Sequence, residues 1–198
     1  MASIEPMTTY PIRNRHWTRQ EYDQLIKIGF FYDDEPIELL GGQLIVAEPK
    51  GSPHQTAIAL TAEALRLGFG PGWSIRIQGP VALDDESEPE PDVVVVPGGP
   101  RDYLAAHPAR PTLLVEVAAS SLAFDRSHKG SLYARAGVAD YWIVNVVDQA
   151  LEVYRQPAVD RSAEFGWRYL DVQVFRAGMT VSPLTRPDVV VAVADLLP

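Results

Sequence analysis

Two acidic residues stand at strand positions where an isolated carboxylate is unusual. Glu116 interrupts the apolar run 112–118, in which alternation places Leu114, Glu116 and Ala118 on one face of a strand. Asp92 directly precedes four valines, at the mouth of a strand whose composition is typical of burial on both faces. Burying an ionised carboxylate costs several kcal/mol unless a cation or hydrogen-bond donors compensate. The two acids together therefore predict a shared cation.

Each acid taken alone also has an ordinary structural explanation. Glu116 could pair with an arginine or lie where its strand reaches solvent, and an aspartate before a strand often forms local hydrogen bonds in a loop. The surrounding run is typical of a solvated loop. In that run six acids crowd into nine positions: Asp84, Asp85, Glu86, Glu88, Glu90 and Asp92.

The predicted ligands suit a hard divalent cation. Mg²⁺ prefers octahedral oxygen coordination and takes one or two protein carboxylates, with water and substrate phosphate in the other positions. Asp92, Glu116 and the backbone carbonyl of Val117 would supply such oxygens from adjacent strands. Bound Mg²⁺ or Mn²⁺ polarises a phosphoryl oxygen and activates a water, which are the two tasks that phosphodiester hydrolysis requires.

A cationic helper is expected on the helix that follows Glu116. Asp125, Lys129 and Tyr133 recur at four-residue spacing and so lie along one helix face. Lys129 is expected to point back at the strand and position the attacking water, with Tyr133 supporting the helix. The alternative is an exposed Asp125–Lys129 pair with Tyr133 packed below it. His54, beside a helix start, is a candidate for phosphate contact or proton transfer, or else a local hydrogen-bonding partner.

The elements that must position these residues are readable from caps, turns and periodicity. Thr18 with Glu21 three residues on forms a capping box that opens a helix to about Ile28. Gly41-Gly42 predicts a two-residue turn between strands 37–40 and 43–46. A second helix begins at Pro53 and runs to about residue 67, and a third covers 125–136 before Gly137. Further strands are expected at 73–77, 93–96, 112–118, 141–147, 151–155 and 167–175, with an extended run at 189–193.

The order of these elements predicts an α/β fold with a mixed sheet. The connection from 112–118 through the third helix to 141–147 suits a right-handed crossover, which makes those strands parallel neighbours. We expect a central mixed β-sheet flanked by helices, with an N-terminal helix and hairpin. We also expect residues 1–16 to be loosely ordered and 17–198 to form a single domain.

Composition limits the classes of site and partner. The 198 residues include no cysteine, which excludes disulfides and thiolate zinc sites. The net charge of −9 speaks against a broad basic face that neutralises phosphates. No apolar run approaches the roughly 18 residues of a membrane span, and the start lacks a signal-peptide core. We therefore expect a cytoplasmic protein without a membrane partner.

Seven short motifs follow one another in a fixed order along the chain. They are Glu38-Leu-Leu-Gly-Gly, Pro53-His-Gln, Pro91-Asp-Val-Val-Val-Val, Leu114-Val-Glu-Val, Asp125-Arg-Ser-His-Lys, Tyr133 and Gly137-Val-Ala-Asp-Tyr-Trp-Ile-Val. In this order they resemble the Uma-two family of restriction-endonuclease-like proteins, and the resemblance covers about residues 17–150.

The resemblance implies a restriction-endonuclease-like core of the PD-(D/E)XK nuclease superfamily. It implies that Asp92 and Glu116 bind the metal and that Glu38 contributes an additional acid. The usual lysine two residues after the acid is absent, because position 118 is alanine, and its role moves to Lys129. The implied function is metal-dependent endonucleolytic hydrolysis of DNA. The segment 118–121 and Asn145 depart from the family pattern, which bears on substrate positioning.

Two other functions remain open at this point. The acidic balance favours a catalytically inactive nuclease-fold module that binds nucleic acid or protein. A purely structural or oligomerising protein is the other, with the apolar strands 141–147 and 189–193 as interface. A homodimer is considered by analogy with nucleases that cut both strands as symmetric dimers.

Overall fold

The computed structural model describes residues 14–32, 35–47 and 50–198. The prediction for residues 1–16 falls mostly outside these ranges, so the division at residue 17 stays a prediction. Among the described residues, no helix has the length and apolar character needed to cross a bilayer.

A six-stranded mixed sheet forms the centre of the molecule. The strands lie in the order β3-β4-β5-β6-β7-β8, and only β5 and β6 run parallel. Their bounds are β3 Trp73–Ile77, β4 Val93–Pro97, β5 Leu113–Ala118, β6 Asp140–Asn145, β7 Ala150–Val159 and β8 Trp167–Arg176. The predicted mixed sheet and its one parallel pair are confirmed.

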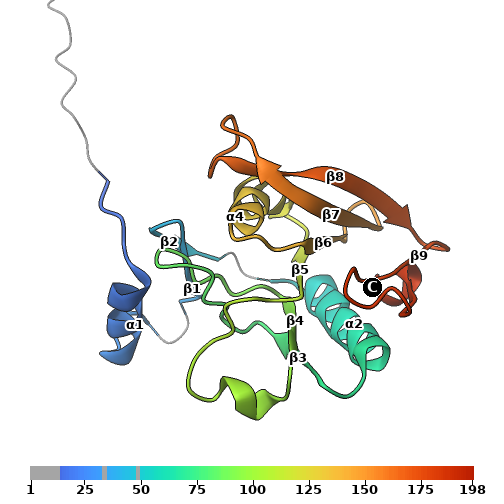
Figure 1. Cartoon of the computed structure of the whole chain (residues 1–198), viewed down its shortest axis with the longest axis horizontal. Coiled ribbons are helices and arrows are strands. Elements are labelled where there is room, and N and C mark those ends of the chain that lie inside the picture. Colours follow the sequence, from blue (N-terminus) through green and yellow to red (C-terminus); the bar gives the residue numbers. More distant parts are fainter. Residues whose placement is uncertain (1–13, 33–34, 48–49) are drawn as a thin grey trace, which may run out of the picture.

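Helices cover both faces of the sheet (Figure 1). One face packs against α2 (Ser52–Phe69) and the C-terminal segment, which contains β9 (Thr180–Val181), β10 (Val191–Ala192) and η3 (Val193–Asp195). The other face packs against one helical segment. That segment consists of α3 (Leu122–Phe124), the π-helical turn η2 (Asp125–Lys129) and α4 (Gly130–Arg135).

The two faces divide β5 as its alternation predicts. Leu113, Val115 and Val117 belong to the α2 side, whereas Leu114 and Ala118 belong to the α4 side. Because Glu116 shares the face of Leu114 and Ala118, its side chain points toward the helical segment that carries Lys129.

The N-terminal elements form as the sequence predicts. The helix α1 (Arg19–Lys27) begins with the capping box of Thr18 and Glu21. The hairpin strands are β1 (Ile37–Leu40) and β2 (Gln43–Val46), and both turn glycines have positive φ. At Gly41 a side chain would collide with the ring of Phe165, so this turn can seat against the β7–β8 hairpin only with glycine there.

Several predicted boundaries are wrong. The third helix begins three residues early and contains a π-helical turn, and the strand expected at 151–155 extends to Val159. The run 189–193 contains only the two strand residues of β10, paired with β9, which the sequence did not predict. A short helix η1 (Pro100–Tyr103) was also not predicted.

The apolar strands considered as an oligomer interface are internal. Tyr141, Trp142, Ile143 and Val144 are fully buried in the sheet, and the valines of the run 189–193 that face inward complete the core beside α2. Val147 and Val190 are the exposed valines of the two segments, and single exposed valines do not form an apolar patch. The hypothesis of a purely structural or oligomerising protein therefore loses its proposed interface.

The acidic run is more than a solvated loop. Glu88 and Asp92 are only 2% and 1% exposed. The amide of Glu88 donates to the carbonyl of Leu39 at 2.7 Å, and Asp84 pairs with Arg135 of α4 at 2.8 Å. The run thus connects the hairpin to α4, and the burial of Glu88 has a consequence for stability.

Stability should fall with rising pH because of Glu88. Burial raises the pKa of its carboxyl to about 7, with Asp23 acting in the same direction and Arg19 opposing. The folded protein holds this proton more tightly than the unfolded chain, so stability declines as the pH rises from 4.5, the ordinary pKa, to about 7. We expect Glu88→Gln to be more stable than the parent at pH 8 by on the order of 2 kcal/mol.

Urea unfolding at pH 5 and pH 8 measures this difference. Glu63→Gln, which changes an exposed glutamate of α2, is the matched control and should track the parent at both pH values. If Glu88→Gln also tracks the parent, the carboxyl of Glu88 is not the group responsible.

Candidate active site

A cavity of about 560 Å³ opens between the β1–β2 hairpin, the start of α2, the β4–β5 strands and the helical segment after β5. The residues proposed from sequence that line it are Glu38, His54, Asp92, Glu116, Val117 and Lys129. Tyr133 lies behind this lining and contacts Glu116. The structure therefore brings every sequence-predicted site residue into one place.

Asp92 and Glu116 are interlocked across the β4–β5 pair. The amide of Asp92 approaches Glu116 Oε2 at 3.4 Å, and the amide of Val117 donates to Asp92 Oδ2 at 2.8 Å. Both carboxylates are almost completely buried. The carboxylate of Glu116 thus lies at the amide of Asp92, and the carboxylate of Asp92 lies at the amide that follows Glu116. The two acids therefore share one small volume at the wall of the cavity.

Lys129 lies between two acids from different strands. Its ammonium is 3.0 Å from Glu116 Oε1 and 3.1 Å from Glu38 Oε2. The hydroxyl of Tyr133 donates to the same Glu116 oxygen at 2.6 Å. The carboxylate of Glu116 is thus held by two donors from the helical segment, which fixes its orientation.

The π-helical turn places this lysine. Asp125 and Lys129 are the first and last residues of η2, and both side chains are buried. The alternative of an exposed pair on a helix surface is therefore wrong. The carbonyl of Asp125 accepts from the Tyr141 hydroxyl at 3.1 Å, and Ser121 Oγ donates to the Asp125 carboxylate at 2.7 Å. Single π turns inside helices are frequent at functional sites.

Two basic side chains, Lys50 and His54, also approach Asp92. Lys50 Nζ is 2.6 Å from Asp92 Oδ1. His54 Nε2 is 3.2 Å from Asp92 Oδ2 but lacks the alignment of a hydrogen bond, and it has no aligned partner. His54 was predicted from the sequence, whereas Lys50 was not, because Lys50 stands before α2 and belongs to no periodic pattern. The only sequence signal for Lys50 was its spacing from His54.

The sequence from residue 19 to residue 194 matches the model of the Uma2 family, described as a putative restriction endonuclease. The chain belongs to the Uma2 family. Its predicted resemblance is therefore confirmed. A search among curated proteins gives no match.

The fold has a solved counterpart. A putative nuclease belonging to DUF820 from Anabaena variabilis superposes with a TM-score of 0.62 and 14% sequence identity. The similarity covers 87% of this chain and 96% of that one. At this identity the likeness shows the fold alone, and it confirms the predicted α/β architecture.

One departure of this Uma2 chain from the expected pattern has a structural explanation. Asn145 stands where the family resemblance expects an acid, and its amide donates to Glu152 of β7 at 2.9 Å. Glu152 also accepts from Arg126 Nε at 2.9 Å. Asn145 thus binds the same carboxylate that holds Arg126 of the π-helical turn carrying Lys129.

Burial and charge shift the titration of the Uma2 site. Burial raises the pKa of Glu116 to about 8, Asp92 and Asp125 push the same way, and Lys129 opposes them. Burial alone would lower the pKa of Lys129, but Glu116 and Glu38 outweigh it and hold the ammonium charged. Burial alone would raise the pKa of Asp92, but His54 and Lys50 outweigh it and lower the pKa overall.

The site is short of positive charge. Five carboxyl groups (Glu38, Glu90, Asp92, Glu116 and Asp125) surround two ammonium groups (Lys50 and Lys129) and one imidazole. The atoms that could bind a metal are hard oxygens, and one buried oxygen of Glu38 has no aligned hydrogen-bond partner. Among the residues described, no three Asp, Glu or His side chains form a complete ligand set. A divalent cation fits if water and backbone carbonyl complete its shell.

Removing the ammonium of Lys129 should destabilise the protein. Lys129→Met leaves the buried carboxylates of Glu116 and Glu38 without their cation, at an expected cost of about 3–5 kcal/mol. The double variant Lys129→Met/Glu116→Gln should lose less than the sum of the two single losses, because the uncompensated charge is gone. Urea unfolding at pH 9, where the carboxyl of Glu116 with its pKa of about 8 is ionised, measures all three variants without divalent cations.

The matched control is Lys27→Met, at an exposed lysine in the last turn of α1, which should stay within about 0.5 kcal/mol of the parent. Strictly additive losses at Lys129 and Glu116 would contradict a direct interaction between the two side chains.

Proposed function

We propose that this Uma2 chain is a divalent-metal-dependent endonuclease that hydrolyses phosphodiester bonds in DNA. The observation that carries the proposal is the convergence of Asp92, Glu116 and Lys129, from two strands and a π-helical turn, on one cavity. The description of the family supports the same class of reaction.

Asp92 and Glu116, with the carbonyl of Val117, would hold Mg²⁺ or Mn²⁺. Such a cation would act as a Lewis acid and would lower the pKa of a bound water. Phosphodiester hydrolysis requires both effects, and amino-acid side chains do not supply them. The two carboxylates are already oriented by the amides of Asp92 and Val117. Little reorganisation is needed when a cation enters.

The ammonium group of Lys129 acts beside the carboxylates of Asp92 and Glu116. Lys129 presents an ammonium at the wall of the cavity, where it stabilises negative charge that develops on a phosphoryl oxygen and positions the nucleophilic water. Glu38 holds the ammonium from the hairpin side, and Tyr133 holds Glu116 from behind. These two residues position the reacting groups and are not themselves required to transfer a proton.

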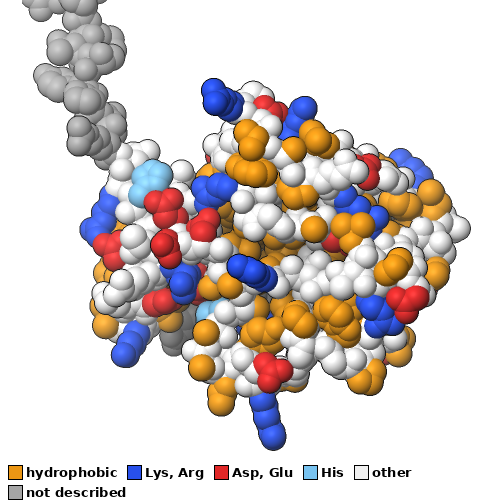
Figure 2. Space-filling view, viewed as in Figure 1, with side chains coloured by type: hydrophobic (Ala, Val, Ile, Leu, Met, Phe, Trp, Pro, Cys, Tyr) orange, Lys and Arg blue, Asp and Glu red, His pale blue; other side chains and the backbone are white. Residues whose placement is uncertain are grey.

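Lys50 and His54 are assigned to the substrate phosphate. Both line the cavity at Asp92, and a side chain at the start of α2 also has the positive end of the helix dipole behind it. A site that makes only a small number of phosphate contacts is consistent with the net charge of −9. On the face shown in Figure 2, Lys and Arg side chains lie scattered among acids and apolar groups.

The second candidate is a module that keeps the fold and binds nucleic acid or protein without cleaving it. The net acidity of the chain favours this reading. Binding of labelled DNA in Mg²⁺ without any loss of the intact strand would distinguish it from the endonuclease.

Plasmid cleavage tests the endonuclease directly. The parent should convert supercoiled DNA to nicked and linear forms in Mg²⁺ or Mn²⁺ and leave it intact in EDTA. Asp92→Asn, Glu116→Gln and Lys129→Met should each lose about 100-fold or more, because each removes a cation ligand or the charge-stabilising group. Titration calorimetry with Mn²⁺ alone should show weaker binding in the two acid variants, independently of activity.

Glu63→Gln is the matched control for Glu116→Gln, because Glu63 is an exposed glutamate of α2 outside the cavity. It should cleave at the parental rate. Equal cleavage by the parent and all three site variants would indicate a contaminating nuclease and overturn the assignment.

A further inference from the structure

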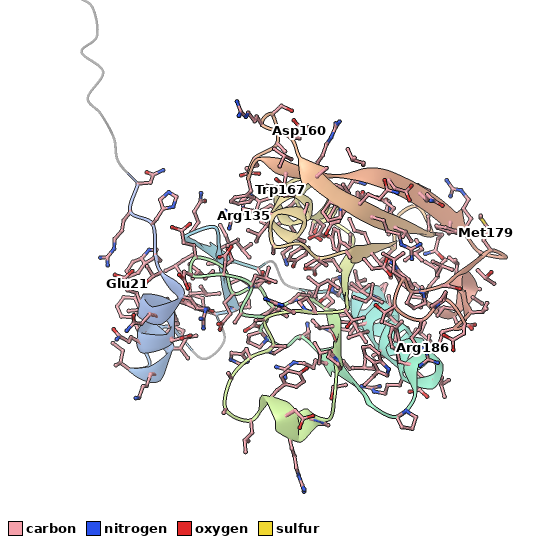
Figure 3. The ribbon with its side chains drawn as sticks, in the orientation of Figure 1. Glu21, Arg135, Asp160, Trp167, Met179 and Arg186 are labelled. Carbon is pink, nitrogen blue, oxygen red and sulfur yellow. The ribbon has the colours of Figure 1, made fainter. Side chains whose placement is uncertain are left out.

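The edge strand β8 presents an apolar ridge to solvent. Leu170, Val172 and Val174 alternate along one face of the strand and are 59%, 48% and 53% exposed. Within the described part of the chain β8 is the last strand of the sheet, and no strand pairs with its outer backbone groups. Figure 3 shows the strand running along the outer side of the molecule between the labelled Trp167 and Met179.

The two edges of the sheet differ in how they are protected. β3 has five residues, carries Arg76 and is followed closely by Gly79 and Pro80. Short length, charge and proline are the usual devices that prevent edge strands from pairing. β8 has ten residues and, between its terminal arginines, contains no lysine, proline or glycine. Its charged residues, Arg168, Asp171 and Arg176, lie outside the exposed apolar run of Leu170, Val172 and Val174, which is left without a protective charge.

The sequence of β8 is nearly symmetric about Val172. On the exposed face the order is Arg168, Leu170, Val172, Val174, Arg176, and on the other face it is Tyr169, Asp171, Gln173, Phe175. Reading outward from Val172 in both directions therefore meets an amide or a carboxylate, then an aliphatic residue, then an aromatic ring, then an arginine. Such a strand complements an antiparallel copy of itself.

We propose that two copies of this chain associate by antiparallel pairing of their β8 strands about a two-fold axis at Val172. The axis stands perpendicular to the sheet, and the two sheets become one. Val172 then faces its own copy, Leu170 faces Val174, and Asp171 faces Gln173, which can donate an amide hydrogen bond to the carboxylate.

Other registers are less favourable. A perpendicular two-fold axis requires one residue to lie opposite itself, because side chains keep their face of the sheet. Centring on Asp171 would place two carboxylates opposite each other, and centring on Gln173 would place Leu170 opposite Arg176. Only the register at Val172 places Leu170, Val172 and Val174 all opposite apolar side chains.

The ends of the strand also tolerate this register. It brings Arg168 opposite Arg176, but each already has an acceptor on its own chain. Arg168 lies 3.2 Å from Asp160 at the β7–β8 turn, and Arg176 donates to the carbonyl of Asp148 at 3.2 Å. The cavity lies at β4 and β5 in the interior of the sheet, so the pairing leaves it open.

One paired strand buries less surface than the roughly 800 Å² per partner of a standard interface. A dissociation constant on the order of micromolar is therefore expected, and sedimentation equilibrium should show monomer and dimer exchanging with protein concentration. Val172→Lys places two ammonium groups at the axis and should leave a monomer. Val190→Lys, at an exposed valine away from β8, is the matched control and should behave like the parent.

Cysteine cross-linking tests the register, because the chain contains no cysteine of its own. Opposed residues of an antiparallel pair have Cα atoms about 4.5–5.5 Å apart, within disulfide range. Val172→Cys should therefore form a disulfide-linked dimer on mild oxidation. Leu170→Cys should not, since each copy of residue 170 lies roughly 14 Å from the other along the strand. Mixed Leu170→Cys and Val174→Cys proteins should link to each other.

Two results would overturn the proposal. The first is a parent protein that stays monomeric at concentrations of 100 µM and above, which would leave the ridge for a different protein. The second is equal cross-linking by Val172→Cys and Leu170→Cys, which would indicate random collision. Neither result bears on plasmid cleavage, so the proposed function is tested separately.

Discussion

The buried ammonium of Lys129 is the interaction on which the rest of the site depends. It joins three segments that are remote in sequence: the β1 strand through Glu38, the β5 strand through Glu116, and the π-helical turn that carries the lysine itself. A buried charge of this kind is costly unless it is well paired. Its presence therefore constrains the hairpin, the sheet and the helical segment to meet at one place, and that place is the cavity.

The surrounding structure holds the lysine more firmly than an ordinary helix would. Asp125 and Lys129 are the first and last residues of the π turn, and both side chains are buried. Arg126 and Glu152 attach the turn to β7, and the Tyr141 hydroxyl binds the Asp125 carbonyl from below. These contacts offset the cost of the irregular turn beside the cavity.

Local rules explain why much of the fold was predictable. The capping box at Thr18, the glycine turn of the hairpin and the period-two pattern of β5 each depend on nearby residues alone, and each prediction is confirmed. Pairing across the chain is a different matter. Lys50 reaches Asp92, and Glu88 bonds to Leu39, over separations at which no periodicity operates. The π turn escaped prediction because a single extra residue in a helix leaves no mark in the spacing of apolar side chains.

The positions of the acidic side chains change how the net negative charge of the chain is interpreted. Among the described residues, seven acids are buried: Glu38, Glu88, Asp92, Glu116, Asp125, Asp140 and Glu152. Asp140 and Glu152 are neutralised by Arg155 and Arg126, but the acids around Lys129 outnumber the cations within reach. Part of the charge that argues against a phosphate-binding face is thus concentrated inside the cavity. There a divalent cation would offset it and, by bringing its own positive charge, would make the same acids a place where a phosphate can bind.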